Sequence, residues 1–123
     1  MSWIAILGVA GVIGAFAFLM QLNSISEEAA RDYLRKGAKV IDVCTTQEYS
    51  ERHLPKAINI PLDELKQRIT SEEPNKEAVL LLHCQGGGRS GAGTQTLKGM
   101  GYKNVFNLGS LERAEKILGG SGK

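Results

Sequence analysis

The amino-acid sequence predicts an α/β domain whose sheet is mostly parallel and carries helices on both faces. Short apolar runs alternate along the chain with segments whose apolar residues recur at helical spacing. One of these runs, residues 79–82, contains no polar residue, as expected for a strand that is buried on both faces. Alternating strands and helices are joined by right-handed crossovers, which place helices on both faces of the sheet.

An uncharged N-terminal segment precedes this domain. Residues 3–20 contain no charge and no proline, and as a helix they would be about 27 Å long, just enough to cross a bilayer. No Lys or Arg precedes the segment and no clean cleavage site follows it, which favours a retained anchor over a cleaved signal peptide. We expect a transmembrane anchor at residues 1–22, a domain at residues 23–118 and a flexible tail at residues 119–123.

Charge distribution bears on the location and on the partners of the domain. Arg31, Arg35, Lys36 and Lys39 follow the anchor and no cation precedes it, so the positive-inside rule favours a single-pass protein of the cell membrane with its domain on the cytoplasmic face. The formal net charge is only +2, which argues against a nucleic-acid partner. No Cys or His cluster has metal-ligand spacing, so no metal site is expected.

The first elements of the domain carry clear capping residues. Ser26 can cap a helix that ends near Arg35, and a strand follows at residues 40–43. Thr45 and Glu48 then form a capping box for the next helix, so Glu48 is better explained by capping than by catalysis.

The remaining elements repeat the alternation. Strands are predicted at residues 57–60, 79–82 and 105–108, and helices at about 62–69, 90–100 and 111–118. Ligands of such folds bind where the carboxyl ends of the strands meet, so the loop after Leu82 is the expected site.

That loop reads HCQGGGRSG. Cys84 ends the strand, three glycines let the backbone curl around it, and a helix begins at about Ser90. Backbone N–H groups and the positive helix end would form a cradle for an anion and favour the reactive thiolate of Cys84. Arg89 adds a permanent cation suited to an oxyanion such as thiosulfate. The alternative is a structural cysteine before a flexible turn.

On these motifs the sequence resembles the rhodanese family over about residues 39–118. IDVCTTQEYSERHLPKAINIPLDEL is similar to the N-terminal signature of the family, and HCQGGGRSG, followed by GYKNVFNL, is similar to its active-site loop. The ending GSLERAEKIL resembles the short phage-shock type found in bacteria. Members of that type are exported, so a periplasmic domain stays open.

The resemblance implies a thiosulfate sulfurtransferase that needs no cofactor. Cys84 would take a sulfane sulfur from a small donor anion such as thiosulfate, carry it as a persulfide and pass it to a thiol or cyanide acceptor. By the same resemblance, the substrate-binding loop comprises Gln85, Gly86, Gly87, Gly88 and Arg89.

Two other functions are open at this point. A membrane-tethered binding module could keep the rhodanese fold, although intact Cys84 and Arg89 argue against it. Cysteine-dependent phosphatases and arsenate reductases also use a Cys–Arg cradle, but their loops have one residue more between Cys and Arg than residues 85–88 provide. A smaller cradle cannot direct the same set of donors at a phosphate.

Four further residues are potential site residues. His83, His53 and Asp42 are expected to be packed or buried residues with structural hydrogen bonds. Cys44 stands where the family usually has arginine. It is either a small packing residue at a strand end or a second thiol that forms a disulfide with Cys84, which requires a Cα separation below about 7 Å.

Overall fold

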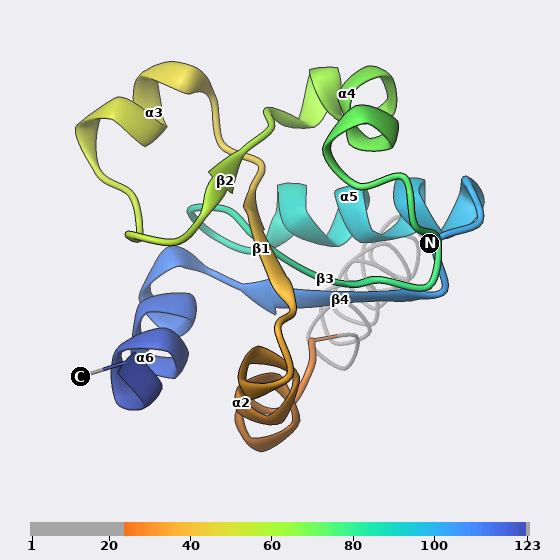
Figure 1. Cartoon of the computed structure of the whole chain (residues 1–123). Helices are drawn as coiled ribbons and strands as arrows, with labels where there is room; N and C mark the ends of the chain where they lie inside the picture. The colour runs from red at the N-terminus through yellow and green to blue at the C-terminus, as the bar shows by residue number, and fades with distance from the viewer. Residues whose placement is uncertain (1–23, 123) are drawn as a thin grey trace, which may run out of the picture.

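The computed structural model describes residues 24–122, which form one α/β unit with a central sheet (Figure 1). The predicted anchor, residues 1–22, lies outside these described residues. Within residues 24–122, no helix combines the length and the apolar character needed to cross a membrane.

The sheet has four parallel strands in the order β2-β1-β3-β4. They are β1 (Lys39–Asp42), β2 (Ile58–Asn59), β3 (Val79–His83) and β4 (Asn104–Gly109). The parallel sheet predicted from the alternation is therefore confirmed. Asp42 of β1 is paired with His83 of β3, so the carboxyl ends of the two central strands lie side by side and the next residues of each begin the site.

One face of the sheet is covered by η1 (Leu62–Glu64), α4 (Leu65–Glu72) and α5 (Gly88–Gly99). Leu65, Ile69 and Leu97 pack there against the side chains of the central strands, such as Leu82. A Cβ atom on Gly93 of α5 would lie 2.9 Å from a methyl carbon of Leu82. The absence of a side chain at Gly93 therefore lets α5, and the loop before it, approach β3 closely.

The opposite face is covered by α2 (Glu27–Arg35) and α6 (Leu111–Gly122), which lie together beside the sheet in Figure 1. Ala30, Ala114 and Ile117 pack against Leu81 and other residues of this face. Helix α6 continues to Gly122, four residues beyond its predicted end. The residues assigned to a flexible tail thus extend this helix as far as the structure describes them.

Helix α3 (Thr46–Glu51) follows β1 and begins with the predicted capping box. The Glu48 N–H donates to Thr45 Oγ1 at 3.2 Å, and the Thr45 N–H donates to Glu48 Oε1 at 2.9 Å. The expectation that His53 is buried is wrong. Its ring is exposed, stacks on Tyr49 and has Nδ1 2.7 Å from the Tyr49 carbonyl oxygen, because it follows the helix end at the surface.

Candidate active site

Cys84 lies directly after the carboxyl end of β3 and is 1% exposed. Its backbone N–H donates to the Gly109 carbonyl at 3.2 Å, which ties the start of the loop to the end of β4. Two backbone N–H groups point at the sulfur: that of Gly87 at 2.9 Å and that of Ser90 at 3.4 Å. The loop therefore surrounds Cys84 Sγ with N–H donors, the kind of cradle that stabilises negative charge on sulfur.

Gly87 gives the loop its curvature. It has φ +98°, in the left-handed region, and it is the residue from which α5 starts. Helix α5 therefore begins at Gly88, two residues earlier than predicted, and Arg89 and Ser90 lie in its first turn. The N–H groups that reach Cys84 Sγ therefore belong to the N-cap residue and the first turn of the helix, where its positive end lies.

Arg89 is held at the rim of the site by Glu48 of α3. Its two terminal nitrogens donate to the two carboxylate oxygens of Glu48, at 2.7 and 3.0 Å. The bidentate pair, which is partly exposed, raises the pKa of the Arg89 guanidinium and lowers the pKa of Glu48 to about 2. The predicted cation is thus present but already has a carboxylate partner. Sequence reasoning assigned Glu48 to capping alone and missed this second role.

The Glu48 carboxylate should make the free energy of unfolding of the domain depend on pH in the acidic range. A pKa lowered in the folded state contributes stability above the unfolded-state pKa, and this contribution is lost as the pH falls from about 4.5 to about 2. We expect the free energy of unfolding, measured by urea titration at several pH values, to fall less over this range in Glu48→Gln than in the wild type. Asp32 and Glu73, whose pKa values are also lowered, remain in both proteins and contribute equally to their acid dependence. Equal losses of unfolding free energy with falling pH would therefore contradict a contribution from Glu48.

Cys44 follows β1 and belongs to the same buried cluster as Cys84. It is 2% exposed, and its N–H donates to Asp42 Oδ1 at 2.9 Å. Burial, with a smaller contribution from Asp42, raises the pKa of the Cys44 thiol to about 12. Because the thiolate is the nucleophilic form of cysteine, this environment favours a packing role for Cys44 over attack on Cys84.

Cys44 is accordingly expected to resist alkylation in the folded protein. With iodoacetamide at about pH 8, where a thiol of this pKa stays protonated, peptide mass mapping should find Cys44 unmodified. The same reagent should modify Cys44 fully once urea has unfolded the chain. Rapid modification of the native protein, or a Cys44–Cys84 disulfide after mild oxidation, would contradict the packing interpretation.

His83 lies beside Cys84 in the chain but not in its cradle. The ring is fully buried, neither of its nitrogens has a hydrogen-bond partner among the described residues, and Nε2 is 3.9 Å from Asp42 Oδ2. Burial outweighs the nearby carboxylate and lowers the pKa of His83, so the ring is neutral. These observations agree with the packed, non-catalytic residue expected from strand alternation.

Ser90 and Asn107 complete the surroundings of the sulfur, and sequence reasoning did not identify either. Ser90 Oγ lies 3.4 Å from Cys84 Sγ and donates to Asn107 Oδ1 at 2.6 Å. Both residues are buried. The available signal was the polar Asn107 within an otherwise apolar predicted strand, because a buried amide needs partners.

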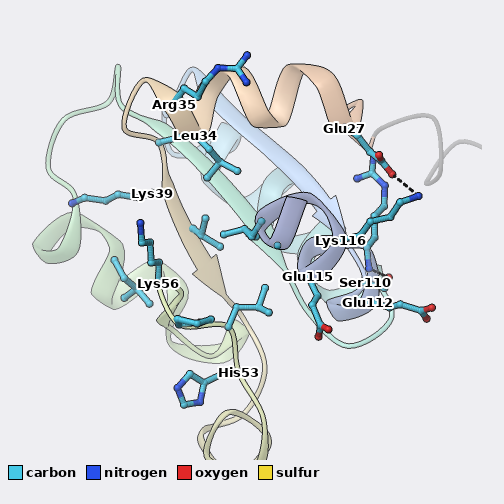
Figure 2. Close-up of a pocket in the computed structure, with 18 of the residues that line it drawn as sticks. Glu27, Leu34, Arg35, Lys39, His53, Lys56, Ser110, Glu112, Glu115 and Lys116 are labelled. Carbon is cyan, nitrogen blue, oxygen red and sulfur yellow. Dashed lines mark hydrogen bonds and ion pairs between the residues drawn. The ribbon is translucent and has the colours of Figure 1, made fainter. Parts of the chain in front are cut away.

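A groove of about 1370 Å³ lies apart from the thiol, between α2, α6 and the segment before β2 (Figure 2). Leu34, His53 and Lys56 are among its lining residues, whereas residues 84–89 are not. Ser110 lines the groove and also forms a β-bridge with Gly86, so the groove includes a residue that is paired with the site loop. Within residues 24–122, no cluster of three or more His, Cys, Asp or Glu side chains could hold a metal ion.

Comparisons with known proteins agree with this geometry. The family model for the rhodanese-like domain matches residues 26–113. Thiosulfate sulfurtransferase PspE of Escherichia coli is 40% identical over 72 residues, which are 58% of this chain and 69% of PspE. The uncharacterized protein YqhL of Bacillus subtilis is 38% identical over 87 residues, which are 71% of this chain and 67% of YqhL.

Solved structures show the same fold. A structure described as rhodanese with anions from E. coli has a TM-score of 0.61 and 38% identity, covering 63% of this chain and 91% of that one. The human single-domain sulfurtransferase TSTD1 has a TM-score of 0.66 and 26% identity, covering 76% of this chain and 96% of TSTD1.

Proposed function

The chain belongs to the rhodanese-like family, whose relatives include sulfurtransferases, and on this basis we propose that it transfers a sulfane sulfur through a persulfide on Cys84. The observation that carries the proposal is the cradle itself. Cys84 Sγ receives the N–H groups of Gly87 and Ser90 at the start of a helix. Such donors stabilise the thiolate that must attack and the anionic persulfide that follows.

The first half-reaction loads the cysteine. The Cys84 thiolate attacks the outer sulfur of a donor such as thiosulfate, and a new S–S bond forms. The bond between that sulfur and the sulfonate breaks, and sulfite leaves with the electron pair. Splitting the transfer into two steps through a covalent intermediate lets one small site serve both donor and acceptor.

The second half-reaction unloads it. An acceptor thiolate, or cyanide, attacks the outer sulfur of the persulfide, and the Cys84 thiolate is released as the leaving group. The N–H donors around Sγ are already placed to receive this negative charge, so little reorganisation is needed. In the first half-reaction, the positive charge of Arg89 attracts the anionic donor. The hydrogen bond to Glu48 fixes the orientation of the Arg89 side chain at the rim.

Intact-mass spectrometry tests the proposal directly. After incubation with thiosulfate, the full chain should gain the mass of one sulfur atom, peptide mapping should place it on Cys84, and sulfite should appear in equal amount. Addition of cyanide should remove the sulfur as thiocyanate. A protein that gains no sulfur from thiosulfate or from an organic thiosulfonate would instead be the rhodanese-fold binding module.

We also propose that residues 1–22 anchor the domain in a membrane, on the strength of their uncharged, apolar sequence alone. Cell fractionation should recover the full chain with membranes after an alkaline carbonate wash, whereas a chain starting at residue 24 should be released. Recovery of both chains in the same fraction would overturn the anchor and leave the sulfur-transfer proposal intact.

A further inference from the structure

A buried pair of polar side chains contacts Cys84 Sγ through the hydroxyl of Ser90. It consists of Ser90, which is 0% exposed, and Asn107 of β4, which is 3% exposed. Asn107 Oδ1 accepts the Gly109 N–H at 2.9 Å, and Asn107 Nδ2 donates to the Gly87 carbonyl at 3.3 Å. These two contacts fix which end of the amide is oxygen, because a backbone N–H requires an acceptor and a carbonyl requires a donor.

The position of the single hydrogen on Ser90 Oγ follows from this assignment. Asn107 Oδ1 has no hydrogen, so its 2.6 Å contact with Ser90 Oγ requires that serine be the donor. The other acceptors near Ser90 Oγ, the carbonyls of Gly87 and Gly109, are more distant, at 3.1 and 3.4 Å. Ser90 therefore presents a lone pair to Cys84 Sγ at 3.4 Å, where it can accept the thiol hydrogen.

In this orientation the Ser90 hydroxyl favours the thiol form of Cys84, whereas the N–H groups of Gly87 and Ser90 favour the thiolate. A thiolate has no hydrogen to donate, so its negative charge would face the lone pair of Ser90 Oγ. The contact becomes favourable when the hydroxyl hydrogen turns from Asn107 to the sulfur, and a hydrogen bond to an anion is stronger than one to a neutral amide. The same holds for a persulfide, since neither of its sulfur atoms carries a hydrogen when it is ionised.

We propose that Asn107 is a positioning residue that controls, through the orientation of the Ser90 hydroxyl, the balance between the thiol and the ionised forms of Cys84. While Asn107 holds the hydrogen, Ser90 stabilises the resting thiol. The thiolate forms when the thiol loses its proton to water. The Ser90 hydroxyl then rotates about its C–O bond and donates to the sulfur of the thiolate or persulfide, and this rotation itself transfers no proton and breaks no covalent bond. The persulfide part of this inference rests on the proposed function, whereas the thiol–thiolate part stands without it.

Other charged and titratable groups near Cys84 stay constant in this scheme. Arg89 of α5 interacts electrostatically with the Cys84 thiol and is paired with Glu48 of α3. Cys44, after β1, is protonated because burial raises its pKa to about 12. His83 of β3, whose ring is neutral, has Nε2 3.9 Å from Asp42 Oδ2 of β1. None of these groups is hydrogen-bonded to the side chain of Asn107 or of Ser90.

The test is the pH profile of Cys84 alkylation by iodoacetamide, followed by peptide mass mapping on the full chain. Asn107→Ala frees the Ser90 hydrogen for the thiolate, so the midpoint of the profile should move to lower pH, by about half a pH unit or more. Ser90→Ala removes the donor, so its midpoint should move to higher pH. In the double variant, loss of Asn107 should add no further shift, because the hydroxyl through which it acts is gone.

Thr94→Val is the matched control. Thr94 is buried in α5, but its hydroxyl donates at 2.8 Å to the backbone carbonyl of Ser90 and not to the side chain. The midpoint of Cys84 alkylation in Thr94→Val should therefore equal that of the wild type. Thermal unfolding of every variant identifies loss of structure, and Asn107→Leu, which keeps the volume without the acceptor, replaces Asn107→Ala if the latter does not fold.

The proposal is supported if the midpoint of the alkylation profile moves to lower pH in Asn107→Ala and this movement disappears when Ser90 is also replaced. No shift in the Asn107 variants, or an equal shift with and without Ser90, would overturn it, because either result separates Asn107 from the hydroxyl. Alkylation involves no sulfur donor, so this failure is distinct from failure of the proposed function, which would show as absence of sulfur on Cys84 by mass.

Discussion

Replacing Cys84 with serine is expected to abolish sulfur transfer from thiosulfate and to leave the fold intact. Serine occupies nearly the same volume and can still accept the N–H groups of Gly87 and Ser90. Its hydroxyl is a far weaker nucleophile at neutral pH and cannot carry a persulfide. Activity should therefore fall below detection, while the free energy of unfolding should change by no more than about 1 kcal/mol.

Cys44→Ser is the matched control for this variant. It changes the other cysteine of the same buried cluster and should keep sulfur transfer, although burying a hydroxyl there lowers stability. Thiocyanate formation from thiosulfate and cyanide measures the activity of both variants, and urea unfolding measures their stability. Retained activity in Cys84→Ser, or loss of activity in Cys44→Ser with the fold preserved, would refute the role of Cys84 as the sulfur carrier.

Gly87→Val is expected to reduce activity by about 100-fold or more, the size of effect that a misplaced site geometry can have. The φ of +98° at Gly87 is rarely adopted by β-branched residues and costs roughly 1–3 kcal/mol where it is enforced. In addition, the new Cβ would be 3.4 Å from two backbone carbons of Gly109, with two methyl groups beyond it. The loop must shift, and with it the Gly87 N–H that points at the sulfur.

Gly87→Ala and Gly99→Ala separate strain from other effects of glycine replacement. Alanine at position 87 keeps the backbone penalty without the branched methyl groups, so its activity should lie between those of the wild type and the valine variant. Gly99 is exposed in α5, and a Cβ there meets nothing within 4 Å. Gly99→Ala should stabilise the helix by about 0.5–1 kcal/mol and keep full activity. Unchanged kinetics in Gly87→Val would show that the curvature of the loop is not required.

The sequence alone was sufficient for the parts of the fold that depend on local pattern. The apolar runs at β1, β3 and β4, the Ser26 cap and the Thr45–Glu48 capping box each correspond to an observed element. The loop position followed from topology, because parallel strands end at one edge of the sheet. The predicted helix ends were less accurate. Helix α5 begins at Gly88 and not at residue 90, since the left-handed Gly87 precedes it directly, and α6 continues to Gly122 and not only to residue 118.

The contacts that shape the site could not be predicted because they join residues far apart in sequence. Glu48 and Arg89 are 41 positions apart, and Ser90 and Asn107 are 17 apart. Each pair depends on how neighbouring elements lie in space, which periodicity does not encode. The same limit applied to Cys44: its identity could be seen in the sequence, but only its burial and the nearby Asp42 show why the thiol stays protonated.

The attachment of the site loop to β4 has a consequence for the biosynthesis of this protein. Cys84 donates its N–H to Gly109, Gly86 pairs with Ser110, and the Leu111 N–H donates to the Gln85 carbonyl. All of these partners are made after the loop, so a nascent chain carries an unsheltered Cys84 until about residue 111 has left the ribosome. During synthesis the Cys84 thiol should therefore be exposed to oxidants for a short time, until β4 pairs with β3 and its end binds the site loop.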